Sequence, residues 1–227
     1  VLDPEDKSFS VEAQVFLPPE ENKHSTIIQF LTGSDPSVLD HGFSLFASAS
    51  RRSDETNLIF AVSSGSSHKI AVSGSFEKGR FNHVSAVYNR TPGQNKLFLY
   101  VNSKLAGESN ISVEMDKIIP RSARFLIGSG TTQLIQEDFV CNEANGSASR
   151  TTFKPQTTLS ASLDEIRFFH TVRRQDEIKA DMYKTIYSSP DLALYFKFDE
   201  PTGSYDGNYI AIDSSGNSLH TPIVNFN

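Results

Sequence analysis

Two pairs of carboxylic side chains are candidates for acid–base chemistry on a glycosidic bond, and their spacing along the chain separates them. Retaining hydrolysis of such a bond needs two carboxyl groups about 5 Å apart, one as nucleophile and one as acid. Glu114 and Asp116 are two residues apart, so on a strand both would point to the same face. Asp164 and Glu165 are adjacent, so on a strand they would point to opposite faces and could not act together.

A short acidic segment near the C-terminal end has the composition of a calcium site. Ca²⁺ binds about six to eight oxygen atoms, several of them from carboxylates and main-chain carbonyls. Asp213 and Asn217 frame the sequence Asp-Ser-Ser-Gly-Asn, and Asp164 could point toward the same end of the protein. These three residues are the predicted ligands of a structural Ca²⁺. The alternative is that Asp213 forms an Asx turn and Asp164 makes polar contacts with Arg167. The sequence leaves both open.

The residue pattern gives little support for a catalytic serine or cysteine nucleophile or for a zinc site. Cys141, the single cysteine, lies among Glu137, Asp138 and Glu143, whose charges disfavour a reactive thiolate. The sequence has no G-x-S-x-G elbow, and no histidine has a partner at zinc-binding spacing. His83 is expected to form structural hydrogen bonds on the wet or half-buried face of its strand. The chain is therefore predicted not to be an enzyme.

Charge and hydropathy argue against two classes of partner. The net charge of −6 and the pI of about 5.5, with dispersed basic residues, disfavour a nucleic-acid surface. No apolar run approaches the roughly 18 residues that a membrane span needs. The chain begins at Val1 without a signal peptide, which indicates a mature or excised piece of a longer protein. A lone cysteine fits a reducing compartment as well as a module cut from a secreted chain.

The elements that must position these residues are almost all strands. Strand-like segments recur at short intervals with Gly, Pro, Asn or Ser between them, which is typical of a β-sandwich. In residues 9–17, apolar residues alternate with Ser10, Glu12 and Gln14, which predicts one buried and one wet face. Residues 173–187 are predicted to form one helix, because Ile178, Met182 and Ile186 are four residues apart.

The rest of the chain shows no boundary between domains. The polar residues 131–156 read as a long loop, which would be functional or disordered. Because no linker or composition shift divides the sequence, residues 1–227 are predicted to form a single domain.

Five segments in this order resemble the laminin-G-like and pentraxin-like branch of the concanavalin A-like jelly rolls. They are SFSVEAQVFLP, GRFNHVSAVYNR, KLFLYVNSKLAGES, RFLIGSG and SLDEIRFFHTVRRQDEI. Positions typical of the family are filled by Phe81, His83, Val84, Tyr88, Leu97, Tyr100, Val101, Leu163, Asp164, Glu165, Ile166, Arg167, Phe168, Glu177 and Ile178. The chain departs from the family where Phe81 replaces a tryptophan and Asn102-Ser103 replaces Asp-Gly.

The resemblance implies an all-β fold, a two-sheet antiparallel jelly-roll sandwich with one short helix. It also implies a non-catalytic recognition or adhesion module, extracellular or on the cell surface, whose partner is a glycan or an extracellular protein. The alternatives are a glycan-active enzyme and a purely structural assembly module. Members that cleave glucans carry E-x-D-x-x-E or E-x-D-x-E on one strand, and here Ile118 and Ile119 occupy the last position.

Fold analogy does not fix a function, and in such modules ligands would bind at loops held by the rigid scaffold. The candidate loops are residues 33–40, 63–69 and 131–156.

Overall fold

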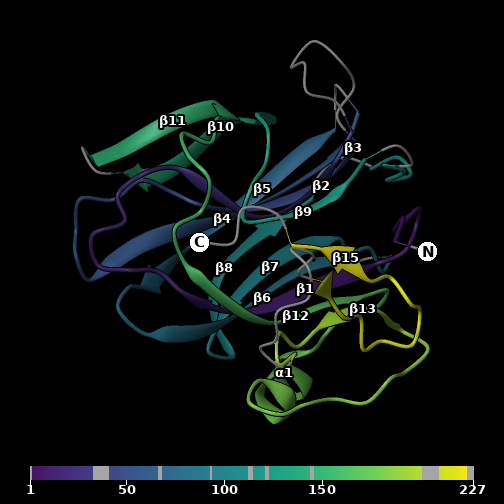
Figure 1. Cartoon of the computed structure of the whole chain (residues 1–227). Coiled ribbons are helices and arrows are strands. Elements are labelled where there is room, and N and C mark those ends of the chain that lie inside the picture. Colours follow the sequence, from purple (N-terminus) through teal and green to yellow (C-terminus); the bar gives the residue numbers. More distant parts are fainter. Residues whose placement is uncertain are drawn as a thin grey trace.

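Two antiparallel sheets form the body of the protein (Figure 1). The computed structural model describes residues 2–32, 41–65, 68–92, 94–111, 115–120, 123–143, 146–200 and 210–223, with backbone only for 136–143 and 146–151. The six-stranded sheet has the order β13 (Leu192–Phe196), β12 (Ser162–Phe169), β1 (Phe9–Phe16), β6 (Phe81–Asn89), β7 (Lys96–Val101) and β8 (Lys104–Asn110). The five-stranded sheet has the order β5 (Lys69–Glu77), β4 (Glu55–Ser64), β3 (His41–Ala47), β2 (Ser25–Leu31) and β9 (Phe125–Ile127). The predicted all-β sandwich is confirmed.

The core lies between the two sheets and is rich in phenylalanine. Phe9 of β1, Phe43 of β3 and Phe168 of β12 are all buried. The ring centroids of Phe9 and Phe43 are 4.8 Å apart, and those of Phe43 and Phe168 are 5.5 Å apart, so these contacts join one sheet to the other. Because aromatic rings bury large areas and pack in offset or tilted pairs, a few of them stabilise the whole sandwich.

One side of the sandwich is closed by a close approach of β5 to β8. A Cβ atom at Gly107 of β8 would lie 2.1 Å from the carbonyl oxygen of Ser73 in β5. A Cβ atom at Gly74 of β5 would likewise lie 2.6 Å from the Cβ of Ala106 in β8. Only glycine permits this contact between the two backbones, so the edges of the two sheets support each other here.

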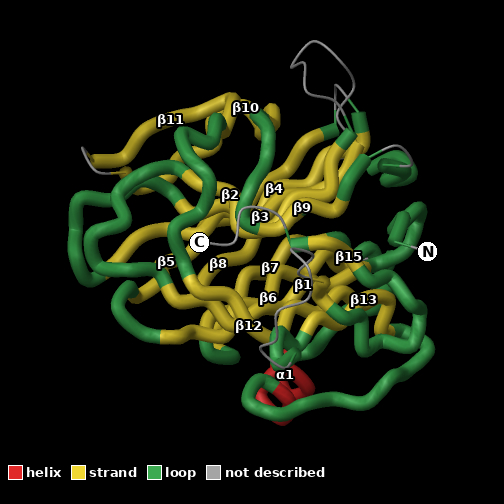
Figure 2. The backbone as a smooth tube through the Cα atoms, viewed as in Figure 1, coloured by secondary structure: helices red, strands yellow, loops and turns green. Residues whose placement is uncertain are grey.

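A short helix covers the outer face of the six-stranded sheet (Figures 1 and 2). This helix, α1 (Gln175–Asp181), is shorter than the predicted span 173–187. The predicted short helix is confirmed at this place, but it ends early because the main-chain carbonyls of Asp181 and Lys184 accept hydrogen bonds from Arg167. Ile186 packs instead on a small cluster of Phe169, Leu192 and Tyr195. No helix in the described part of the chain is long and apolar enough to cross a membrane.

Burial of the polar side of β1 corrects a second prediction. Ser10, Glu12 and Gln14, expected to be wet, are buried, and so is His83 of the neighbouring strand. The alternation in β1 is real, but α1 and the residues after it lie over the face that it would otherwise expose. Sheet periodicity identifies two faces and does not say what covers them.

A β-hairpin covers part of the outer face of the five-stranded sheet (Figure 1). It consists of β10 (Gln133–Glu143) and β11 (Gly146–Phe153), and it corrects the predicted loop at residues 131–156. Phe153 stacks on Phe46 of β3 with ring centroids 4.0 Å apart, and Ile135 belongs to the same buried cluster. A second small sheet pairs β14 (Ile210–Ala211) with β15 (Thr221–Pro222). That residues 1–227 form a single domain stays a prediction.

Candidate functional site

A groove opens at one end of the sandwich, between two connections that are distant in sequence. One wall is the β1–β2 connection and the other is the segment that leads from β11 into β12; both are loops in Figure 2. The groove has a volume of about 330 Å³. We call it the rim groove, and its lining residues are Pro18, Glu20, Glu21, Asn22, Lys23, Thr157, Thr158 and Ser160. Seven of these eight side chains carry hydrogen-bonding groups.

Main-chain contacts fix the two walls against each other. The Gln156 N–H donates to the carbonyl of His24 at 2.8 Å, and the His24 N–H donates to the side-chain Oε1 of Gln156 at 2.9 Å. Ser25 and Thr157 form a parallel bridge next to them. Because these contacts involve the backbone, the groove is part of the folded scaffold.

A buried lysine braces the wall formed by the β1–β2 connection. Lys78 lies in the β5–β6 turn, and its Nζ donates to the carbonyl oxygens of Pro19, Glu21 and Ser50 at 3.3, 2.6 and 3.1 Å. Burial lowers the pKa of Lys78, and the charges of Glu21, Asp54 and Glu20 oppose that shift.

An aromatic pair lies at the same end of the molecule. Phe81 of β6 and Phe16 of β1 are paired in register, with ring centroids 5.6 Å apart, and Phe81 is 53% exposed. The chain reaches the groove two residues after Phe16, and the Gly79 N–H donates to the carbonyl of Leu17 at 2.8 Å. This end therefore combines a half-exposed aromatic ring with a polar groove.

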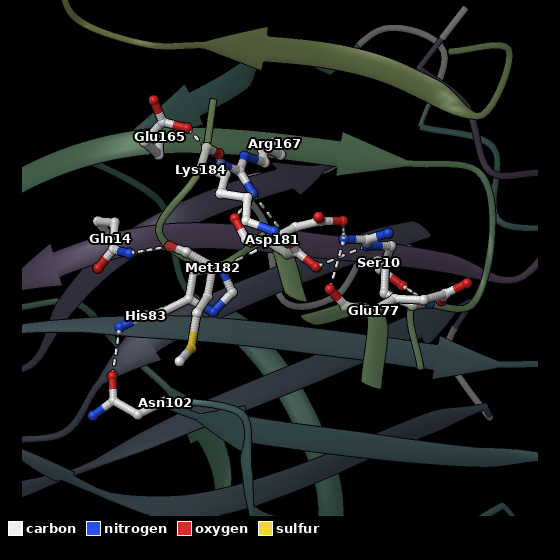
Figure 3. A network of polar contacts seen from close by, with 12 residues as sticks. Ser10, Gln14, His83, Asn102, Glu165, Arg167, Glu177, Asp181, Met182 and Lys184 are labelled. Carbon is white, nitrogen blue, oxygen red and sulfur yellow. Dashed lines mark hydrogen bonds and ion pairs between the residues drawn. The ribbon is translucent and has the colours of Figure 1, made fainter. Parts of the chain in front are cut away.

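A network of charged side chains lies under α1, away from the rim groove, and Figure 3 shows Arg167 of this network between Glu165 and Asp181. We call it the α1 clamp, and it consists of Glu12, His83, Glu165, Arg167, Arg173 and Asp181. The carboxylate of Glu12 lies 3.1 Å from Nε of Arg173, 3.5 Å from Nη1 of Arg167 and 3.5 Å from Nε2 of His83. Burial acts to raise the pKa of Glu12, but the interactions with His83, Arg173 and Arg167 outweigh it, so that the pKa lies below its ordinary value.

The α1 clamp holds the helix and offers no room for a ligand. Arg167 bridges Glu165, Glu12 and the main-chain carbonyls of Asp181 and Lys184. Glu12, His83 and Arg167 are at most 1% exposed, so no substrate can reach them. A β-bulge on β12 brings Glu165 to this face, because Glu165 has φ = 51° and the register shifts opposite Glu12 and Gln14. The clamp is a structural device.

The predicted calcium ligands occupy two places with different surroundings. Asp213 is buried, and its carboxylate accepts hydrogen bonds from the N–H groups of Tyr195, Ser215 and Leu219 and from the Ser215 hydroxyl, at 2.8–3.0 Å. Burial acts to raise the pKa of Asp213, and these hydrogen bonds lower it below its ordinary value. Nδ2 of Asn217 donates to the main-chain carbonyls of Leu192 and Ala193 on β13 and to Oγ of Ser215 in its own turn.

Asp164 lies on β12, paired with Gln14, and its Oδ1 accepts the N–H of Glu165 at 2.9 Å. Burial raises the pKa of Asp164, and the charges of Glu165 and Asp199 add to that shift. Among the described residues, no three His, Cys, Asp or Glu side chains are grouped so as to hold a metal ion. The contacts of Asp213 are those of an Asx-type turn, and the calcium site stays a prediction.

The remaining predicted residues are only partly placed. The carboxylate of Asp116 lies 3.1 Å from Nδ1 of His68, whereas Glu114 lies outside the described residues. Cys141 is on β10, with a side chain that is not described. The loop at 33–40 is outside the described residues, as are two positions of the loop at 63–69.

Sequence reasoning missed the rim groove. Its walls are more than a hundred residues apart in the chain, and no local sequence pattern predicts that they lie side by side in the fold. The Pro-Pro-Glu-Glu-Asn-Lys run at 18–23 indicates a turn, but Lys78 resembles any surface lysine until the fold is known.

Comparison with known proteins places the chain among lectin-like folds. Residues 2–179 match a laminin-G-type family described as the concanavalin A-like lectin/glucanases superfamily. No curated protein matches the chain. A Bacteroides ovatus structure described as a carbohydrate binding protein is 19% identical with a TM-score of 0.53, and the alignment covers 97% of this chain and 56% of that one.

A heptameric SAP-like pentraxin from Limulus polyphemus is 15% identical with a TM-score of 0.54, over 97% of this chain and 82% of that one. At these identities the likeness shows the fold, and this chain spans little more than half of the Bacteroides protein. The chain belongs to the concanavalin A-like lectin/glucanases superfamily.

Proposed function

We propose that this protein is a non-catalytic recognition module that binds a glycan in the rim groove. The observation that carries the proposal is that one end of the sandwich has both a groove lined by carboxylate, amide, amine and hydroxyl groups and, beside Phe16, the half-exposed ring of Phe81. Sugars offer hydroxyl groups to the first and an apolar C–H face to the second. Membership of a superfamily that contains lectins supports this proposal, as does the likeness to a protein described as carbohydrate-binding.

The distribution of carboxylates favours binding over cleavage. Glycosidases place their two carboxyl groups on either side of the scissile bond. In the rim groove both acidic residues, Glu20 and Glu21, come from the same wall, whereas the opposite wall contributes the hydroxyls of Thr157, Thr158 and Ser160. A sugar in the groove would meet acid from one side only. We further propose an extracellular or cell-surface location, within a longer protein.

A glycan array, probed with and without EDTA, tests the proposal. The parent chain should retain at least one glycan. The double variant Glu20→Gln/Thr157→Ala and the single variant Phe81→Ala should each weaken that binding about tenfold or more, by removing about 1.4 kcal/mol or more of contact energy. Tyr187→Ala is the matched control, because Tyr187 is an aromatic residue that is 90% exposed and lies outside the groove.

Three results would reject the proposal. The first is retention of no glycan by a folded parent chain, which would favour a protein ligand. The second is unchanged glycan binding in both groove variants. The third is release of reducing ends from polysaccharides by the parent chain, which would make it an enzyme.

A further inference from the structure

We propose that the ammonium group of Lys78 is an internal cation that fixes the shape of the rim groove, so that Lys78 is a positioning residue for ligand binding. The consequence for binding rests on the proposed function, whereas the consequence for the shape of the loop does not.

The geometry around Lys78 is that of an ion in a cage of carbonyl oxygens. A lysine ammonium has three N–H donors, and here the nitrogen has three main-chain acceptors, in Pro19, Glu21 and Ser50. Proteins hold hard cations with the same kind of oxygen. Lys78 is only 7% exposed, so water does not compete freely for these donors.

The three acceptors belong to two loops that Lys78 ties together. Pro19 and Glu21 are in the groove wall, and Ser50 is in the connection between β3 and β4. The backbone of Lys78 is held independently, because its N–H donates to the carbonyl of Asp54 at 2.9 Å. The side chain therefore extends from a fixed point to two loops.

The groove wall is attached to the body of the protein at its two ends, where the Leu17 carbonyl accepts the N–H of Gly79 and the His24 N–H donates to Oε1 of Gln156. Within it, the Glu21 N–H donates to Pro18 at 3.0 Å, and the Lys23 N–H donates to Oε1 of Glu21 at 2.9 Å. Both bonds lie inside the loop and do not attach it to the body of the protein. Without the ammonium, the carbonyls of Pro19 and Glu21 lose a buried donor, and the loop must move to hydrate them.

Hydrogen exchange of the amides of residues 20–23 tests this inference without any glycan. Lys78→Ala should raise their exchange rates at least tenfold and leave those of β1 and β6 unchanged. Methylammonium ions, which fit the vacated cage and carry N–H donors, should return the rates toward those of the parent. Tetramethylammonium, which has no N–H donor, should not. Lys104→Ala is the matched control at an exposed lysine of β8.

A second variant keeps the test valid if Lys78→Ala fails to fold. Lys78→Met keeps the apolar stem and removes only the donors, so it should fold and show the same faster exchange. Unchanged exchange at residues 20–23 in either folded variant would overturn the inference, and so would equal rescue by both ammonium ions.

The outcome on the glycan array separates this inference from the proposed function. If the parent retains a glycan, both Lys78 variants should bind it at least tenfold more weakly. If the parent retains none, the proposed function fails, and the exchange rates alone decide whether Lys78 shapes the groove.

Discussion

Replacing Arg167 with methionine should destabilise the protein more than the loss of one surface charge would. Arg167 is fully buried and bridges Glu12, Glu165 and the main-chain carbonyls of Asp181 and Lys184. Methionine fills much of the same volume without donating a hydrogen bond. The change leaves the carboxylate of Glu12 buried with less compensating charge.

The size of the effect follows from the cost of breaking a buried ion pair. Removing one partner of such a pair costs about 3–5 kcal/mol, because the other charge stays buried. For a chain of this length, 1 kcal/mol corresponds to about 2–4 °C in the unfolding midpoint, so we expect a fall of about 10 °C. Local detachment of α1 would limit this loss of stability, because the only helix residue that is buried is Ile178 and the helix could separate without unfolding of the sandwich.

Thermal unfolding and hydrogen exchange measure the two parts of this prediction. Arg167→Met should lower the midpoint and speed exchange in residues 175–187, whereas Arg51→Met, at an exposed arginine, should do neither. The double variant Glu12→Leu/Arg167→Met should recover much of the loss, because two well-packed apolar residues need no charge partner. A midpoint within about 2 °C of the parent for Arg167→Met would refute the reasoning.

Three further predictions concern acid, calcium and the hairpin. The pKa of Glu12 is lowered in the folded state, so the ionised carboxylate should stabilise the fold fully above its ordinary pKa of 4.5, and this stabilisation should be lost as the pH falls from 4.5 through the lower folded-state pKa. Glu12→Gln should make the unfolding midpoint less sensitive to pH in this acidic range. Asp213→Ala should lower stability by about 2–3 kcal/mol in EDTA and in millimolar Ca²⁺ alike, because main-chain N–H groups lose their acceptor; a midpoint that rises with Ca²⁺ only in the parent would instead support the calcium site. Phe153→Ala should remove the stacking on Phe46, cost about 3–5 kcal/mol, and expose the β10–β11 hairpin to limited proteolysis, and equal protease resistance would contradict this.

The sequence predicted the layers of the fold because sheet periodicity and aromatic content are local signals. The alternation in residues 9–17 corresponds to β1, and the family-like segment RFLIGSG contains β9. The hairpin at 131–156 escaped prediction because its sequence is mostly polar, although Ile135 and Phe153 belong to a buried cluster with Phe46 of the sheet. The helix was predicted too long because periodicity does not show that Arg167 would capture its last carbonyls.

The candidate site could not be predicted in the same way. Asp164 and Asp213, which the sequence predicted as calcium ligands, accept hydrogen bonds from main-chain N–H groups of the protein. The rim groove depends on contacts such as that between His24 and Gln156, which only the folded chain brings together. Lys78 was invisible for the same reason, because its three acceptors come from two separate loops.

Mapping of amide chemical shifts by NMR, with a glycan selected on the array, tests the central claim most directly. Titration should shift the resonances of residues 20–23, 157–160 and Phe81 with one common dissociation constant. Shifts that cluster on the β10–β11 hairpin or around α1, with the groove resonances unmoved, would show that the ligand binds elsewhere and that the rim groove is not the recognition site.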